Sequence, residues 1–331
     1  MPIHPRHANR ILGAAALTLG AALLAPLGAS AQAWPDKPVK IFVGSAAGSA
    51  PDIIARLIGD QLGQMWGKGI VVENRPGAGG NLGAQAAARS APDGYTLWFA
   101  HATPVVMNQF LFKNPGFDSE KDFDPVVRVG VNPMMISVNP GVPVKDLKEL
   151  VAYVKARPGK VSFATSGTKN IPHLVGETLN DVAQVDMLNI PYKGSQQAAT
   201  DTIAGRTEVY IDAVPPMAPF IGADGKLRPI AVTTAQRLPG HDDIPTAREQ
   251  GVELVMQGWM AFLAPAGTPA PIVERVARDV NNVLARPDTV ARLRMLGTFE
   301  LGGTTAAFDN FVKVERAKWG RVVQAAGIER E

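Results

Sequence analysis

The stretch VKIFVGSAAGSAPDIIARLIGDQLGQMWGKGIVVEN, residues 39–74, contains two short apolar runs on either side of a helical pattern. The runs VKIFV and GIVVEN are rich in β-branched residues and predict strands. Between them, apolar residues recur at helical spacing from Ile53 to Met65, and Pro51 suits the first turn of a helix. This order of strand, loop, helix and strand is typical of an α/β protein with parallel strands and right-handed crossovers.

The same alternation continues along most of the chain. Further strands are predicted at residues 95–100, 161–166, 186–192, 207–212 and 227–234. Helices are predicted at residues 51–67, 82–91, 144–159, 171–182, 195–205, 271–287, 288–297 and 304–327, with a short one within 215–225. The sequence therefore predicts the α/β class with largely parallel sheets.

Two apolar stretches interrupt this alternation, at residues 127–146 and 252–269. Each is long enough to cross from one domain to another, and two crossings make the first domain discontinuous. We expect residues 34–136 and 255–331 to form domain I and residues 137–254 to form domain II. A chain of this length is typical of two domains.

The first 33 residues have the pattern of a secretory signal peptide. Arg6 and Arg10 precede an apolar run at residues 11–27, and small residues in an A-x-A arrangement follow before Trp34. The alternative, a retained membrane anchor, is disfavoured because glycines and Pro26 interrupt a run that is short for a bilayer span. We expect cleavage before Trp34 and a periplasmic protein without a lipid anchor, since the chain has no cysteine.

Charge and composition exclude several classes of protein. Without residues 1–33 the chain has 31 basic and 30 acidic side chains, a formal net charge of +1, so nothing suggests a nucleic-acid partner. The absence of cysteine excludes disulfides, thiolate metal sites and cysteine nucleophiles. The motifs H-E-x-x-H, G-x-x-x-x-G-K-[ST] and G-x-S-x-G do not occur. We expect no catalysis, metal or cofactor, although a Ser166–His173–Asp212 triad can be drawn from residue types alone.

The loop between the first predicted strand and helix can bind an anion. The first turn of a helix leaves backbone N–H groups unpaired, and the small residues around Gly48 and Ser49 let a carboxylate or phosphate approach them. Asp52 has two equally supported interpretations, as a favourable charge at the helix N-terminus or as a polar contact to the ligand.

Three other loops also follow predicted strands. Residues 166–170 (SGTKN) and 192–195 (YKGS) precede helices, and ligands bind at the carboxyl ends of strands in open α/β sheets. Lys193 is either a partner for a ligand carboxylate or a solvated surface residue. The glycine-rich stretch at residues 73–84 lacks the dinucleotide-binding spacing, because Leu82 stands where the third glycine is required. A structural loop at the edge of a cleft is therefore favoured there over a direct ligand loop.

These stretches together resemble the Bug family of periplasmic solute-binding proteins of tripartite tricarboxylate transporters. The resemblance runs from WPDKPVKIFV to KWGRVVQAAG and includes VVENRPGAGGNLGAQAAARSAPDGYTLWFA, IPYKGSQQAATDTIAG and FLAPAGTPAPIVERV. It implies a two-domain Venus-flytrap fold with a ligand cleft between the domains. It also implies capture of a small organic anion, namely a di- or tricarboxylate, an acidic amino acid or an aromatic acid, and its delivery to membrane permease subunits by a monomeric carrier. An exported serine hydrolase and a partner that presents its ligand to a sensor are the alternatives.

Through this resemblance the binding role extends to several loops. The expected ligand-binding residues are Gly48, Ser49, Asp52, His101, Thr103, Ser166, Thr168, Asn170, His173, Tyr192, Lys193, Gly194 and Asp212. The opening loop departs from the family pattern, in which a Pro-rich turn and a Gly-Gly pair precede the helix. Here Ser49 replaces the second glycine and Pro51 precedes Asp52, and Lys169 and Ile171 stand where small residues are usual. We expect Ser49 to contact a carboxylate or a bridging water.

Overall fold

The computed structural model describes residues 34–222, 225–299, 301–325 and 330. The chain falls into two compact units, Met1–Asp36 and Lys37–Glu331, and every strand and helix described below lies in the second. The predicted signal peptide, residues 1–33, lies outside the described residues. Within the described residues, no helix is both long and apolar enough to cross a membrane.

The opening stretch forms the predicted strand, helix and strand. Strand β1 covers Val39–Val43, helix α2 covers Ala50–Trp66, and strand β2 covers Ile70–Asn74. Helix α2 ends at Gly67, whose φ of 62° is the left-handed conformation that glycine adopts without steric cost. Its fully buried face includes Ile54, Ile58 and Leu62. Burying a side chain of this size contributes about 2 kcal/mol, so packing rather than propensity holds the helix in place.

The other elements lie close to their predicted positions. The strands are β3 (Thr96–His101), β4 (Phe123–Val138), β5 (Val161–Thr165), β6 (Met187–Pro191), β7 (Val209–Ala213), β8 (Arg228–Val232) and β9 (Gln257–Pro265). The helices are α3 (Asn81–Ala88), α4 (Asn108–Leu111), α5 (Leu147–Lys155), α6 (Ile171–Ala183), α7 (Ser195–Ile203), α8 (Val214–Met217), α9 (Ala270–Leu284), α10 (Pro287–Met295) and α11 (Thr305–Ala325). The sequence did not predict α4 or the π-helical turn Thr103–Met107 that precedes it.

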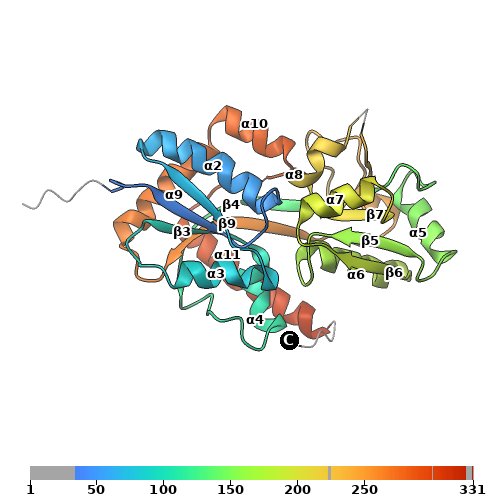
Figure 1. The fold of residues 1–331 in the computed structure, drawn as a ribbon, viewed down its shortest axis with the longest axis horizontal. Coiled ribbons are helices and arrows are strands. Elements are labelled where there is room, and N and C mark those ends of the chain that lie inside the picture. The colour runs from blue at the N-terminus through green and yellow to red at the C-terminus, as the bar shows by residue number, and fades with distance from the viewer. Residues whose placement is uncertain (1–33, 223–224, 300, 326–329, 331) are drawn as a thin grey trace, which may run out of the picture. The chain divides into compact units, whose positions relative to one another are not determined.

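The strands form one curled sheet in the order β2-β1-β3-β9-β4-β7-β5-β6, with β8 beside β4 (Figure 1). Strand β1 pairs in parallel with β2 and β3, and β5 pairs in parallel with β6 and β7. The two long strands β4 and β9 are antiparallel to each other and to their other neighbours. The expectation of largely parallel sheets is therefore wrong for the middle of the sheet.

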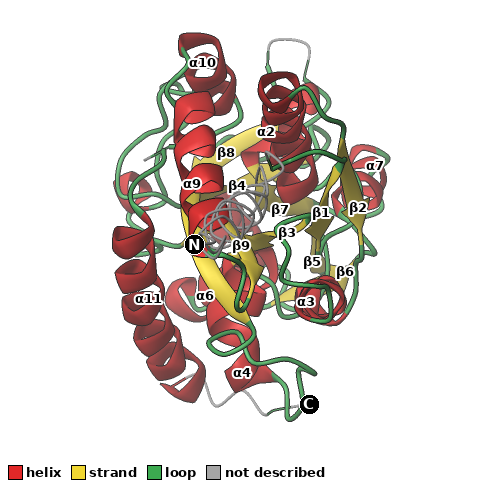
Figure 2. Ribbon diagram, turned by 90° about the vertical axis from the view of Figure 1, so that its left-hand side faces the viewer, coloured by secondary structure: helices red, strands yellow, loops and turns green. Residues whose placement is uncertain are grey.

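The long strands connect the two groups of parallel strands. Along β4, residues from Phe123 to Pro133 pair with β9, and residues from Met134 to Val138 pair with β7. Helices α9 and α11 pack against β4, whereas α3 packs against β1 and β3 (Figure 2). Because β1, β3, β5 and β7 all end near the middle of this sheet, the loops that follow them meet there.

Candidate functional site

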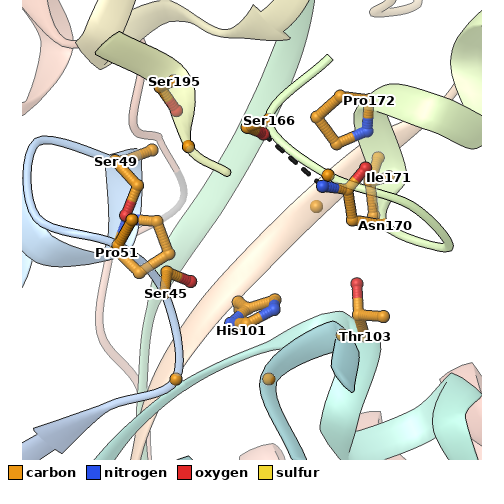
Figure 3. Close-up of a pocket in the computed structure, with 18 of the residues that line it drawn as sticks. Ser45, Ser49, Pro51, His101, Thr103, Ser166, Asn170, Ile171, Pro172 and Ser195 are labelled. Carbon is orange, nitrogen blue, oxygen red and sulfur yellow. Dashed lines mark hydrogen bonds between the residues drawn. The ribbon is translucent and has the colours of Figure 1, made fainter. Parts of the chain in front are cut away.

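A cavity of about 660 Å³ lies where these loops meet (Figure 3). This volume is within the usual range for pockets that bind small molecules. The lining residues come from the loops after β1, β3, β5, β6 and β7, from the glycine-rich turn and from the middle of β4 and β9. They are residues 44–46, 49–51, 76–80, 101–103, 112, 132, 134, 166–168, 170–172, 191–195, 212–213 and 258–260.

The structure brings ten of the thirteen predicted site residues to this cavity. They are Ser49, His101, Thr103, Ser166, Thr168, Asn170, Tyr192, Lys193, Gly194 and Asp212. The other three, Gly48, Asp52 and His173, are not among the lining residues. Asp52 and His173 instead bond within their own loop or helix, and Gly48 bonds to Asp52 and to Gln196 on α7.

Asp52 holds the loop after β1 in place. Its Oδ2 accepts a hydrogen bond of 2.8 Å from the Gly48 N–H, and its Oδ1 accepts one of 2.9 Å from Arg56 Nε. Arg56 also donates to Asn74 Oδ1, and Asn74 donates to the Ser45 carbonyl. This chain of bonds joins the start of α2 to the end of β2, which supports a positioning role for Asp52.

The Asp52 network predicts how stability depends on pH. Burial opposes ionisation of Asp52, but hydrogen bonds from Arg56 and Gly48 outweigh it and lower the pKa of the carboxyl below its usual 3.8. A carboxyl with a depressed folded-state pKa contributes stability that is present above its unfolded pKa and lost as pH falls through the folded value. We expect Asp52→Asn to lower the free energy of unfolding by about 2 kcal/mol at neutral pH, because charge-assisted bonds are lost.

Urea unfolding from neutral pH to below pH 4 tests this prediction. The stability difference between wild type and Asp52→Asn should shrink as pH falls below about 4, where the wild-type carboxyl takes up its proton. The matched control is Asp60→Asn, which removes an exposed carboxylate from the same helix. An equal effect of the two substitutions at all pH values contradicts the positioning role.

His173 is engaged outside the cavity. Its Nδ1 accepts a hydrogen bond of 2.9 Å from the Lys169 N–H, and its Nε2 lies 3.3 Å from a Glu177 carboxylate oxygen. Both ring nitrogens are therefore occupied on helix α6. Ser166 instead lies 3.5 Å from Asn170 Nδ2 (Figure 3), so Ser166, His173 and Asp212 do not form a relay.

Several polar side-chain atoms at the cavity wall are buried without a hydrogen-bond partner in the described part of the chain. They are Ser49 Oγ, Ser195 Oγ, Thr103 Oγ1, His101 Nδ1, Asn132 Oδ1 and Trp259 Nε1. Buried polar groups are nearly always hydrogen-bonded in native proteins, and each exception calls for an explanation such as a ligand or an ordered water. These atoms therefore mark the places where the wall can bind a polar molecule.

Asp212 is a buried acid in the same cavity. Its Oδ2 accepts a hydrogen bond of 2.9 Å from the Tyr210 hydroxyl, and its Oδ1 accepts one of 2.8 Å from the Ala213 N–H. Burial raises the pKa of the Asp212 carboxyl above 3.8, although the nearby Ser195 hydroxyl, the Ala213 N–H and the Tyr210 hydroxyl oppose the shift. Lys193, the one lysine among the described lining residues, which include no arginine, is exposed.

The glycine-rich stretch contributes both close packing and cavity wall. A side chain at Gly83 would place its Cβ 2.5 Å from the Gly44 Cα, so α3 can rest against the end of β1 only without one. This close approach supports the interpretation of residues 73–84 as a structural loop, in which glycine is needed for packing. Residues 76–80 also line the cavity, so the turn could contact a ligand as well.

Sequence reasoning missed the part of the wall formed by β4, β9 and Phe112. Asn132 and Met134 lie on β4, and residues 258–260 lie on β9. The sequence did offer a signal for β4 and β9. Both stretches were predicted to cross between the two expected domains, and residues in such a crossing are expected to face the cleft between the domains. No sequence signal singled out Phe112.

Comparison with known proteins shows the family to which the chain belongs. The model of the "Tripartite tricarboxylate transporter family receptor" (TctC) matches residues 54–328. The chain belongs to this family. It is also similar to the periplasmic binding protein BugD, with 32% identity and a TM-score of 0.84 over 90% of this chain and 100% of that one. The resemblance to the Bug family is thereby confirmed, as is the periplasmic-binding-protein fold.

Two similar TctC-type structures carry named ligands. A Rhodopseudomonas palustris protein solved with adipate is 32% identical, with a TM-score of 0.86 over 90% of this chain and 100% of that one. MatC from Rhodopseudomonas palustris, with bound malate, is 29% identical, with a TM-score of 0.80 over 88% and 100%. The TctC family is one of solute-binding proteins and not of enzymes, so the hydrolase alternative is set aside.

Proposed function

We propose that this TctC-family protein is a periplasmic receptor that binds a small organic carboxylate in the cavity and delivers it to the membrane subunits of a tripartite transporter. The family match supports this function, and so do the adipate and malate named for two similar structures. Export through residues 1–33, with cleavage before Trp34, belongs to the same proposal.

The buried serine hydroxyls at the starts of two helices are the observation that carries the proposal. Ser49 immediately precedes α2, and Ser195 is the first residue of α7. They are 6% and 1% exposed, and neither hydroxyl makes a hydrogen bond of good geometry in the described residues, although Ser195 lies close enough to Asp212 to lower the pKa of that carboxyl. Each lies at the N-terminus of a helix, where the positive end of the helix dipole favours a carboxylate, although the N–H groups of Gly48 and Ser49 already donate to Asp52 and to the Ala46 carbonyl.

A third helix adds to this environment. Ile171 and Pro172 in the first turn of α6 line the cavity, so the N-termini of α2, α6 and α7 all face it (Figure 3). Asn170 caps α6 by accepting a hydrogen bond of 3.1 Å from the His173 N–H. A ligand carboxylate at this end of the cavity needs no arginine, because helix N-termini and hydroxyls supply the donors.

We also propose that the cavity opens and closes between two domains. The division expected from the sequence, at residues 136/137 and 254/255, cuts β4 near its end and falls just before β9, so these two strands would act as the hinge. Two loops on opposite sides of that division touch at the cavity. Gln196 Nε2 lies 3.3 Å from the Gly48 carbonyl, to which it donates, and Gly194 approaches Ala46.

A thermal-shift screen followed by calorimetry tests the proposed function. The panel contains dicarboxylates, tricarboxylates, acidic amino acids and aromatic acids, with neutral and cationic analogues as controls. We expect at least one carboxylate to stabilise the protein in proportion to its concentration and to be recovered unchanged. Binding of neutral or cationic compounds alone contradicts the proposal.

Ser49→Ala tests the contribution of the first serine. Loss of a hydroxyl that bonds a charged group should weaken carboxylate binding by about tenfold, since such bonds contribute roughly 1.5 kcal/mol. Calorimetry with the acid found in the screen gives the affinity. Ser90→Ala is the control, because its hydroxyl donates to the Ala86 carbonyl at the end of α3 rather than facing the cavity. Equal affinity of wild type and Ser49→Ala rules out a hydroxyl contact.

A further inference from the structure

The buried hydroxyl of Tyr210, on strand β7, lies between two acceptors. Its oxygen is 3.1 Å from the Ser195 carbonyl oxygen and 2.9 Å from Asp212 Oδ2. A tyrosine hydroxyl has one hydrogen to donate, so the Ser195 carbonyl and an ionised Asp212 compete for it. Both contacts are hydrogen bonds at once only if Asp212 carries a proton on Oδ2, donates it to the Tyr210 oxygen and leaves the tyrosine hydrogen for the Ser195 carbonyl. The geometry therefore favours an uncharged carboxylic acid at Asp212.

The immediate surroundings of Asp212 are uncharged as well. Its side chain lines the cavity but the residue is only 4% exposed, and its Oδ1 accepts a hydrogen bond from the Ala213 N–H. Burial raises the pKa of Asp212 above 3.8 against the opposing effect of the Ser195 and Ser166 hydroxyls. Burial also raises the pKa of Tyr210 well above 10, so the tyrosine keeps its hydrogen at neutral pH. A buried carboxylate without a close opposite charge is disfavoured relative to the acid.

Other ionisable side chains face Asp212 from the neighbouring elements. They are His101 on β3, Tyr192 and Lys193 on the loop after β6, Lys169 on the loop after β5, and His173 and Glu177 on α6. Burial lowers the pKa of His101 to about 4 and that of His173 below 6.5, and it raises the pKa of Tyr192 above 10. Lys193 is exposed, and Lys169 Nζ lies 5.7 Å from the centre of the Phe112 ring. Between about pH 6.5 and 9, neither histidine and neither tyrosine changes its charge.

We infer that Asp212 takes part in binding in its uncharged form, so that capture of a carboxylate is linked to one proton held between Asp212 and Tyr210. The inference rests on the proposed function, in which the ligand carboxylate lies near Ser49 and Ser195. An anion beside Ser195 and an ionised Asp212 would repel each other, because two carboxylates at one site do not readily ionise together. Where free Asp212 is ionised, Oδ2 therefore takes a proton from solvent as the ligand binds.

Calorimetry from about pH 6.5 to about pH 9 tests this linkage. The probes are adipate, malate and the acid that stabilises the protein most in the thermal-shift panel, all of them ionised in this range. We expect the affinity to fall at least about tenfold across the range, since a site linked to one proton loses up to about tenfold per pH unit. Titrations in phosphate and in Tris, whose enthalpies of protonation differ, should show a net uptake of protons by the wild type.

Asp212→Asn locates the proton. The amide keeps the shape of the acid and stays neutral, with an N–H for the Tyr210 oxygen and an oxygen for the Ala213 N–H. Its affinity should vary less than about twofold over the same range and exceed that of the wild type about fivefold at the highest pH. The matched control is Asp279→Asn, which removes another buried carboxylate that bonds to Trp66 Nε1 and does not line the cavity. This control should keep the wild-type pH dependence.

The possible outcomes separate the inference from the proposed function. A wild-type affinity that stays constant over the range, without proton uptake, overturns the inference while the proposed function stands. The same holds if Asp212→Asn keeps the wild-type pH dependence, or binds less tightly than the wild type at the highest pH, as it would if the ligand needed an ionised Asp212. The proton uptake of the wild type is measured without the variant, so a poorly folded variant does not imitate the expected result. If no acid of the panel binds, both are overturned.

Discussion

Gly194→Val is expected to weaken binding of the acid found in the screen at least about thirtyfold, a loss of roughly 2 kcal/mol. Gly194 has a φ of 155°, which a β-branched residue adopts only with strain. Its Cβ would also lie 2.9 Å from the Ala46 Cβ, in the loop after β1. The valine therefore separates the two loops that meet at the cavity, exposes Ser49 and Ser195 to water and weakens their contact with a carboxylate.

The control for Gly194→Val is Gly205→Val. Gly205 also has a positive φ, of 75°, but the atom nearest to its Cβ would be Asn139 Nδ2 at 3.9 Å, and the residue does not line the cavity. Backbone strain alone should lower the melting temperature of Gly205→Val and leave its affinity unchanged. Wild-type affinity in Gly194→Val would mean that contact between the loops is not needed for binding.

Gly83→Ala is expected to lower the free energy of unfolding by about 2–3 kcal/mol, as overpacking of a close contact does. The new Cβ would lie 2.5 Å from the Gly44 Cα and 2.8 Å from the Gly44 nitrogen. These are backbone atoms, which cannot rotate away as a flexible side chain can. Helix α3 must therefore move away from the end of β1, which also displaces the glycine-rich turn from the cavity wall.

Urea unfolding of Gly83→Ala and Gly69→Ala separates the clash from the effect of a methyl group on the unfolded chain. The Cβ of an alanine at position 69 would have no atom nearer than 3.9 Å, in Pro38. Both substitutions restrict the unfolded backbone alike, and alanine is favoured over glycine inside helix α3, so a lower stability of Gly83→Ala than of Gly69→Ala reports the clash. Equal stability of the two variants would contradict the close packing of α3 against β1.

The α/β class could be predicted from the sequence because local signals agreed. The spacing from Ile53 to Met65 gives α2 one apolar face, and Gly67 ends the helix where a left-handed residue was needed. The predicted loops after β1, β5 and β6 do line one cavity, since parallel strands end at the same edge of a sheet. Residue types along the chain were sufficient for these conclusions.

The roles of individual polar residues could not be predicted, because they depend on partners far apart in the sequence. Asp52 had two equal interpretations until its bonds to Gly48 and Arg56 were seen, and those bonds depend on how the loop folds back on α2. His173 follows a cavity loop in the sequence, yet helix geometry pairs it with Glu177, four residues later.

The sequence by itself determined the alternation of strands and helices and which loops carry polar residues, because both follow from local periodicity and turn chemistry. Only the tertiary structure decided that β4 and β9 run antiparallel through the middle of the sheet and that Ser49, Ser195, Thr103 and His101 line one cavity. It also decided that a polar atom of each of these side chains is buried without a hydrogen bond of good geometry in the part of the chain that the structure describes. Whether a buried polar atom is satisfied depends on every element packed around it, and that packing is fixed by contacts between residues distant in the chain.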